Sequence, residues 1–98
     1  MNTIKRTPEF DVWLKALRDG VGRAAIVGRL SRAASGNFGD VRPVGEGVSE
    51  MRIHAGPGYR VYYFQEGNTI YVVTNGGDKG TQQRDIERAK QMARELRG

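Results

Sequence analysis

Glycine-rich turns at short intervals in the second half of the chain are the feature that most restricts its fold. The turns are Gly45-Glu46-Gly47, Gly56-Pro57-Gly58 and Gly67-Asn68. They separate four segments of strand length, which are the weak Asp40–Val44, then Val48–Ala55, Tyr59–Gln65 and Thr69–Asn75. Pro43 restricts the first of these to a sheet edge or a bulge. Connections this short predict an antiparallel meander of consecutive strands.

The first third of the chain has helical signals, after a short edge strand expected at Asn2–Arg6. Thr7-Pro8 has the form of an N-cap followed by proline at the first helical position, and Asp19-Gly20 ends that helix. A second helix is expected from about Gly22 to Ala34. Two helices joined by a tight turn predict an αα-hairpin that packs on one face of the sheet.

A last helix is expected after the strands, capped by Thr81 and ending near Leu96. Its inward-facing residues should be Ile86, Ala89, Ala93 and Leu96. The predicted fold class is therefore α+β, with an antiparallel meander, an N-terminal helical hairpin, a C-terminal helix and a second sheet face left at least partly open. A length of 98 residues predicts one domain, residues 1–98.

The net charge of +5 favours acidic partners such as nucleic acid, although a basic chain can also be basic only for solubility. With no cysteine and one histidine, a metal site is not expected, and no cofactor is predicted. The absence of cysteine fits a reducing compartment, and no apolar run is long enough to span a membrane. These features together predict a cytoplasmic protein with no membrane partner.

Strand side chains alternate between faces, which sorts the residues of the two central strands. If Met51 and Ile53 pack on the helices, the open face should gather Glu50, Arg52, His54, Arg60 and Tyr62. Further cations that are expected on or near this face are Arg42, Lys79 and Arg84. The face centred on Ser49–Tyr62 is therefore predicted to bind RNA.

This set of side chains has what metal-independent cleavage of a phosphodiester needs, which is a base, an acid and cations. His54 is the natural proton-transfer group near neutral pH, and Glu50 is a second candidate base. Arg52 and Arg60 suit phosphate contacts, and Tyr62 offers a ring for stacking on a base. Each has a plainer explanation: an exposed polar histidine, arginines paired with Glu50, and a tyrosine of ordinary strand propensity.

Three stretches of the chain carry a family resemblance. They are Asn37-Phe-Gly-Asp-Val-Arg-Pro-Val-Gly, then Val48-Ser-Glu-Met-Arg-Ile-His with Gly56-Pro-Gly-Tyr-Arg-Val-Tyr-Tyr, and Gly76-Gly-Asp-Lys-Gly-Thr-Gln-Gln-Arg-Asp-Ile. The chain resembles the RelE/ParE toxin superfamily, and looks closest to its addiction-module killer or HigB-like branch. The order of expected helices and strands agrees along nearly the whole chain.

The resemblance implies a toxin of a bacterial type II toxin–antitoxin system. RelE-like members are endoribonucleases that cut mRNA on the ribosome. By position, Arg60 matches the arginine that stabilises the transition state, Arg52 a basic residue of the preceding strand, and Lys79 a basic proton donor. The C-terminal catalytic tyrosine has no counterpart, since that region reads Arg84-Asp85-Ile86.

That departure keeps two alternatives open: a ParE-like inhibitor of DNA gyrase without nuclease activity, and a degenerate toxin that only binds its antitoxin. The resemblance also implies the partners. They are a cognate antitoxin, often a helix-turn-helix protein, then mRNA and the ribosome, and operator DNA that is bound mainly through the antitoxin.

Overall fold

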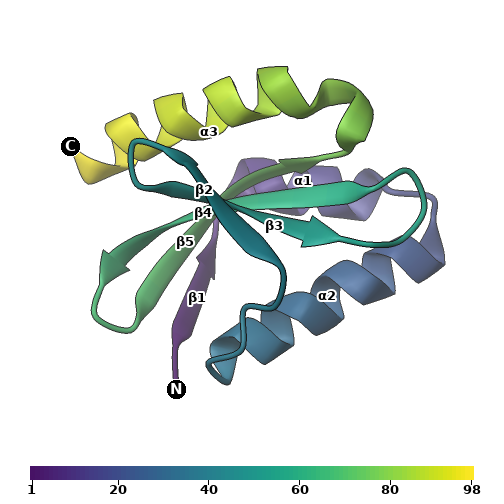
Figure 1. Cartoon of the computed structure of the whole chain (residues 1–98), viewed down its shortest axis with the longest axis horizontal. Coiled ribbons are helices and arrows are strands. Elements are labelled where there is room, and N and C mark those ends of the chain that lie inside the picture. The colour runs from purple at the N-terminus through teal and green to yellow at the C-terminus, as the bar shows by residue number, and fades with distance from the viewer.

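The computed structural model describes all 98 residues, and it arranges one five-stranded sheet between helices on both faces (Figure 1). In chain order the elements are β1 (Thr3–Arg6), α1 (Pro8–Ala16), α2 (Gly20–Ala34), β2 (Val41–Gly45), β3 (Val48–Ile53), β4 (Tyr59–Gly67), β5 (Ile70–Gly77), a short 3₁₀ turn (Lys79–Thr81) and α3 (Gln82–Arg97). This confirms the α+β class and the order of elements that the sequence predicts.

Two side-chain caps set the limits of the first helices. The hydroxyl of Thr7 accepts a hydrogen bond from the Phe10 amide and donates one to the Thr74 carbonyl, which fixes the start of α1 against β5. The prediction that Asp19 ends the first helix is wrong. The Asp19 carboxylate accepts from the Gly22 amide at 2.9 Å and starts α2, so α1 ends earlier, at Ala16.

The sheet has the strand order β1-β5-β4-β3-β2 and is mixed. Strands β2 to β5 form the predicted antiparallel meander, and the register shifts at Pro43 on the edge strand β2. β1 differs from the other strands, because it lies parallel to its neighbour β5 along Thr3–Arg6. A strand separated from its neighbour by the whole hairpin of helices is not limited to the antiparallel pairing that a short turn imposes.

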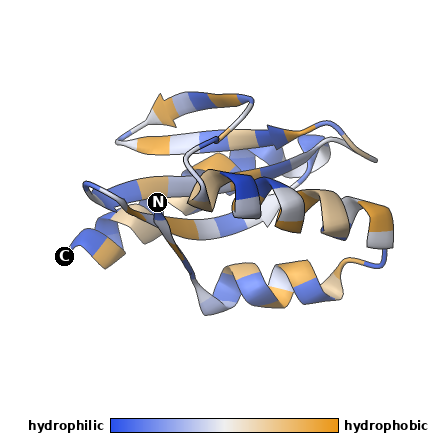
Figure 2. Ribbon diagram, turned by 90° about the horizontal axis from the view of Figure 1, so that it is seen from below, coloured by the Kyte–Doolittle hydropathy of each residue, from blue (hydrophilic) through white to orange (hydrophobic).

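Each face of the sheet has its own apolar core. Beneath α1 and α2 lies a cluster of eleven buried residues that includes Phe10, Ile26, Met51 and Val61. Beneath α3 lies a smaller cluster of seven, with Val48, Phe64 and Ile86 among them. Figure 2 shows apolar and polar residues interspersed along the strands and helices that form these two cores.

The helix α3 covers much of the face that was predicted to be open. Its first residue, Gln82, bonds to Glu50, and its last, Arg97, lies over the ring of Phe64. Ile86, Ala89 and Ala93 face inward as predicted, but Leu96 is half exposed and Met92 is buried instead. None of the helices is both long and apolar enough to cross a membrane.

Candidate functional site

Arg52 on β3 and Arg60 on β4 stand directly opposite each other in the antiparallel register. The side chain of Arg52 is 37% exposed and that of Arg60 is 13% exposed. In both, the Nε atom is buried and has no hydrogen-bond partner. We call these two residues the arginine pair.

The guanidinium of Arg60 is held by the turn that precedes β4. One of its terminal nitrogens donates to the Gly58 carbonyl at 2.6 Å. Gly58 has a φ of +80°, and a Cβ there would lie 2.8 Å from Arg60 and 3.6 Å from the Cβ of Lys79. Glycine at this turn therefore lets Arg60 and the stem of Lys79 approach the same point of the backbone.

Lys79 follows β5 in the short 3₁₀ turn and is exposed. Its amino group takes part in no ion pair, in contrast to Lys5 and Lys90, which do. The sequence prediction placed this lysine near the rim of the sheet face. Because the Lys79 Cβ and the Arg60 guanidinium both lie close to Gly58, the stem of Lys79 starts near the arginine pair.

Glu50 lies two residues before Arg52 on β3, on the same face of the sheet, and is fully buried. Its carboxylate accepts hydrogen bonds from Arg42 Nε at 3.1 Å, from the Tyr62 hydroxyl at 3.1 Å and from Gln82 Nε2 at 2.9 Å. Arg60 Nε lies 3.9 Å from Oε2. Burial alone would raise the pKa of Glu50, but the bonds from Gln82, Arg42 and Tyr62 together hold that pKa below its ordinary value.

This environment corrects the expectation that Glu50 and Tyr62 lie on the open face. Glu50 is enclosed and both of its carboxylate oxygens accept hydrogen bonds from neighbouring side chains. It therefore stabilises the site and has no free path to a substrate. Tyr62 is fully buried in the cluster under α3, where burial and the Glu50 carboxylate raise the pKa of its phenol. A ring packed in this way has no free face for stacking on a base. Arg42, expected to contact RNA, is half exposed and is paired with Glu50.

His54 lies at the end of β3 and is 75% exposed, as an open face requires. Its Nε2 atom is 2.6 Å from Oδ2 of Asp40, and the other oxygen of Asp40 accepts from a terminal nitrogen of Arg52 at 3.1 Å. The bond to His54 is the main cause that lowers the pKa of the Asp40 carboxyl, and Arg52 adds to it against the effect of burial.

Asp40 is the site residue that the sequence prediction missed. The register of the structure explains its place, because β2 and β3 pair Arg42 with Glu50, and the same register places Asp40 across from Arg52. The Arg52 amide donates to the Asp40 carbonyl at 2.9 Å, which continues that register past the end of β2. Residue type alone gave no reason to single out an aspartate at the start of a weak strand.

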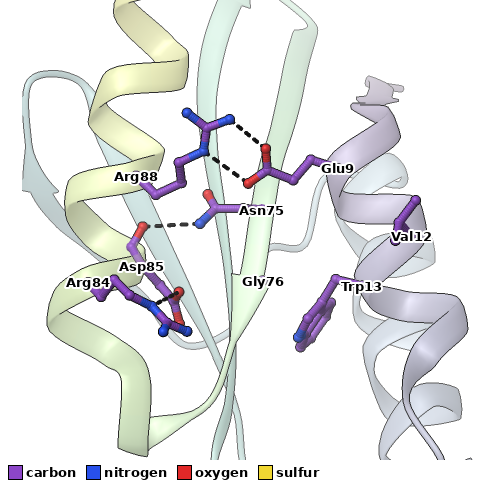
Figure 3. Close-up of a pocket in the computed structure, with 8 residues that line it drawn as sticks. All are labelled: Glu9, Val12, Trp13, Asn75, Gly76, Arg84, Asp85 and Arg88. Atoms are coloured by element: carbon purple, nitrogen blue, oxygen red, sulfur yellow. Dashed lines mark hydrogen bonds and ion pairs between the residues drawn. The ribbon is translucent and has the colours of Figure 1, made fainter.

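Arg84 lies in the first turn of α3. It lines a groove of about 440 Å³ between α1 and α3, at the edge of β5, together with Glu9, Val12, Trp13, Asn75, Gly76, Asp85 and Arg88 (Figure 3). A two-pronged ion pair between Arg88 and Glu9 ties the two helices across this groove. Arg84 is 78% exposed and lies 3.8 Å from Asp85. The arginine pair does not line this groove, and the expectation that Arg84 contacts RNA stays a prediction.

The exposed part of the site is cationic and carries one imidazole. Arg52, Arg60 and Lys79 provide positive charge, and Asp40 balances part of it. No three His, Asp or Glu side chains meet in an arrangement that could hold a metal ion. The arrangement suits an anion with several oxygens, such as a phosphodiester, placed beside a group that can transfer a proton.

Comparison with known proteins gives two matches. Residues 12–96 match the family described as "Phage derived protein Gp49-like (DUF891)". A protein of Haemophilus influenzae (strain Rd), described only as uncharacterized, is 44% identical over 93 residues. That alignment covers 95% of this chain and 94% of the relative, so the two are similar along their whole length.

Proposed function

The chain belongs to the family of phage-derived Gp49-like proteins, and from this premise we propose that it is the toxin of a type II toxin–antitoxin system. Its proposed activity is metal-independent cleavage of mRNA on the ribosome. The resemblance to RelE-like and HigB-like toxins supports this proposal, as does the net charge of +5. The single observation that carries it is the arginine pair, with the imidazole of His54 beside it.

The arginine pair, on two neighbouring strands, forms a suitable binding site for the phosphate group that is to be cleaved. Arg52 is 37% exposed, and Arg60 is largely buried, which strengthens its interaction with an anion. In the proposed mechanism, Arg52 and Arg60 stabilise the negative charge that builds up on the phosphoryl oxygens. His54 accepts the proton of the attacking 2′-hydroxyl, and Lys79 donates a proton to the leaving 5′-oxygen.

The buried carboxylate of Glu50 supports this proposal indirectly. It fixes Arg42, Tyr62 and Gln82 by hydrogen bonds and lies close to Arg60. A fixed carboxylate beside Arg60 helps to hold this arginine in place before RNA binds, so little reorganisation is needed in the transition state.

A translation reaction tests the proposal. Purified protein added to it without extra metal should cut mRNA within the translated region, and mapped 5′ ends should bear hydroxyl groups. Arg60→Ala should lower the cleavage rate by about 100-fold or more, because it removes the more buried cation. Arg32→Ala is a matched control, since Arg32 is an exposed arginine of α2 on the other face of the sheet.

Three results would speak against the nuclease. The first is no cleavage by the wild-type protein. The second is cleavage by Arg60→Ala at the wild-type rate, in a sample with unchanged circular dichroism. The third is a loss of cleavage in Arg32→Ala as large as the loss in Arg60→Ala. The first of these leaves the gyrase alternative, which is favoured by the absence of a C-terminal tyrosine, where the chain reads Arg84-Asp85-Ile86. A supercoiling assay with purified gyrase separates the two, because only that alternative predicts inhibition.

The partners follow from the proposal. We expect a cognate antitoxin, of helix-turn-helix type in this branch, and binding of the complex to operator DNA chiefly through the antitoxin. Expression of the chain alone should arrest growth, and co-expression of the gene product encoded beside it should relieve the arrest. Normal growth on expression alone would leave only a degenerate toxin.

A further inference from the structure

The contact between Asp40 and His54 determines which nitrogen of the imidazole is free. A carboxylate has acceptors only, so the Nε2 atom at 2.6 Å from Asp40 must carry a hydrogen in the neutral imidazole. The lone pair of the neutral ring is then on Nδ1. This is the nitrogen that remains available to take a proton from another molecule.

Asp40 is itself fixed from two sides. Its other oxygen accepts from Arg52 at 3.1 Å. Arg29 reaches up from α2 and donates to the Arg52 carbonyl at 2.6 Å and to the Asp40 carbonyl at 3.3 Å. A Cβ at the neighbouring Gly39 would lie 2.8 Å from that guanidinium, so glycine is what lets Arg29 approach. Asp40, the partner of His54, is therefore held by Arg52 at its side chain and by Arg29 at its backbone.

We propose that Asp40 is a positioning residue that holds His54 in the Nε2–H tautomer and so presents Nδ1 as the general base. This inference rests on the proposed nuclease function. Nδ1 takes the proton of the 2′-hydroxyl while that oxygen forms a bond to phosphorus and the bond from phosphorus to the 5′-oxygen breaks. The leaving oxygen receives a proton from Lys79. The products are a 2′,3′-cyclic phosphate and a 5′-hydroxyl, with one proton gained by His54 and one lost by Lys79.

Asp40→Asn gives a direct test, because the structure predicts how the new amide will turn. Arg52 offers only donors, so the single carbonyl oxygen of the amide should face Arg52. Its NH₂ group then faces Nε2 of His54, which must accept. The substitution should thus keep the contact with Arg52 and move the imidazole proton to Nδ1.

Nitrogen NMR of the imidazole reads the tautomer without any activity assay. His54 is the only histidine, so the two ring nitrogens need no further assignment among residues. At a pH where the ring is neutral, wild type should show protonated Nε2 and bare Nδ1. Asp40→Asn should show the reverse. The same tautomer in both proteins, or a proton on Nδ1 in wild type, would overturn the proposal.

The cleavage assay then links the tautomer to catalysis. Asp40→Asn and His54→Gln should each lower the cleavage rate by about 100-fold while RNA binding is unchanged. The double variant should lose no more than either single one, because the two residues act as a unit. Asp11→Asn, which alters an aspartate of α1 paired with Arg6, is the matched control and should cleave like wild type.

The outcomes separate this inference from the proposed function. Cleavage by wild type together with full rates in both single variants shows a nuclease with a different base, and the inference fails alone. No cleavage by wild type means that the proposed function fails, and the catalytic role of Asp40 falls with it, whichever tautomer the NMR spectrum reports.

Discussion

The phenol of Tyr62 donates a hydrogen bond to Oε2 of Glu50 at 3.1 Å, and neither side chain is exposed. Since Arg42 and Gln82 bond to the same carboxylate, one buried charge connects β2, β3, β4 and the first residue of α3. A buried charge is costly unless all its partners are in place. Stability and the shape of the site should therefore respond together when a partner is removed.

Tyr62→Phe should lower the free energy of unfolding by about 1–3 kcal/mol, because it removes a donor from a carboxylate that stays buried. Urea denaturation followed by circular dichroism measures this. Tyr71→Phe is the control, since Tyr71 is only partly buried and its change should stay within about 0.5 kcal/mol. Equal stability of the two variants would contradict the prediction.

Glu50→Gln should lower the free energy of unfolding by about 3 kcal/mol near neutral pH, since it leaves Arg42 and Arg60 without their counter-charge. The pKa of Glu50 is below its ordinary value of 4.5 in the folded protein. Its ionised form therefore adds stability above that ordinary value, and this is lost as the pH falls through the folded value. The difference between wild type and variant should narrow in acid; a constant difference would argue against a charged Glu50.

Arg84→Ala should cut mRNA at a rate close to wild type, whereas Arg52→Ala should lose about 100-fold. The reason is position, because Arg84 lines the groove between α1 and α3 and Arg52 belongs to the arginine pair. The measurement is the initial rate of cleavage in the translation reaction. If Arg84→Ala were the more damaging change, the substrate would lie across the groove.

Gly77→Ala should lower the free energy of unfolding by about 3 kcal/mol, because a Cβ at this end of β5 would overlap an oxygen of the buried Asp85. Gly28→Ala is its control. That position in α2 has open space around it, so alanine should raise stability by about 1 kcal/mol through helix propensity. Thermal unfolding of both variants distinguishes a local clash from a general effect of alanine.

The fold was largely predictable because its signals are local. Turn glycines divide the strands, and the Thr7-Pro8 cap starts α1. The parallel pairing of β1 with β5 was not predictable in this way, because it depends on how α1 and α2 direct the chain between β1 and the rest of the sheet. The end of α1 was misplaced because Asp19 has the same residue type whether it follows one helix or caps the next.

For the site, alternation along strands predicts that Arg52, His54 and Arg60 share a face, and the register then places Arg52 opposite Arg60. It cannot tell which part of a face a helix will cover. Glu50 and Tyr62 share that face, yet α3 begins above them and buries both. The roles of the site residues remain predictions, which the variants above address.

The pairing of β1 with β5 also affects the order in which the protein can mature. The hydroxyl of Thr7 bonds to the carbonyl of Thr74, 67 residues further along, and the strand before Thr7 lies beside the strand that contains Thr74. A growing chain therefore carries its first strand without a neighbour until nearly all of β5 has been synthesised. Contacts of such long range form late. The sheet should therefore gain its parallel edge strand last, after the β3–β4 hairpin that carries the arginine pair has formed.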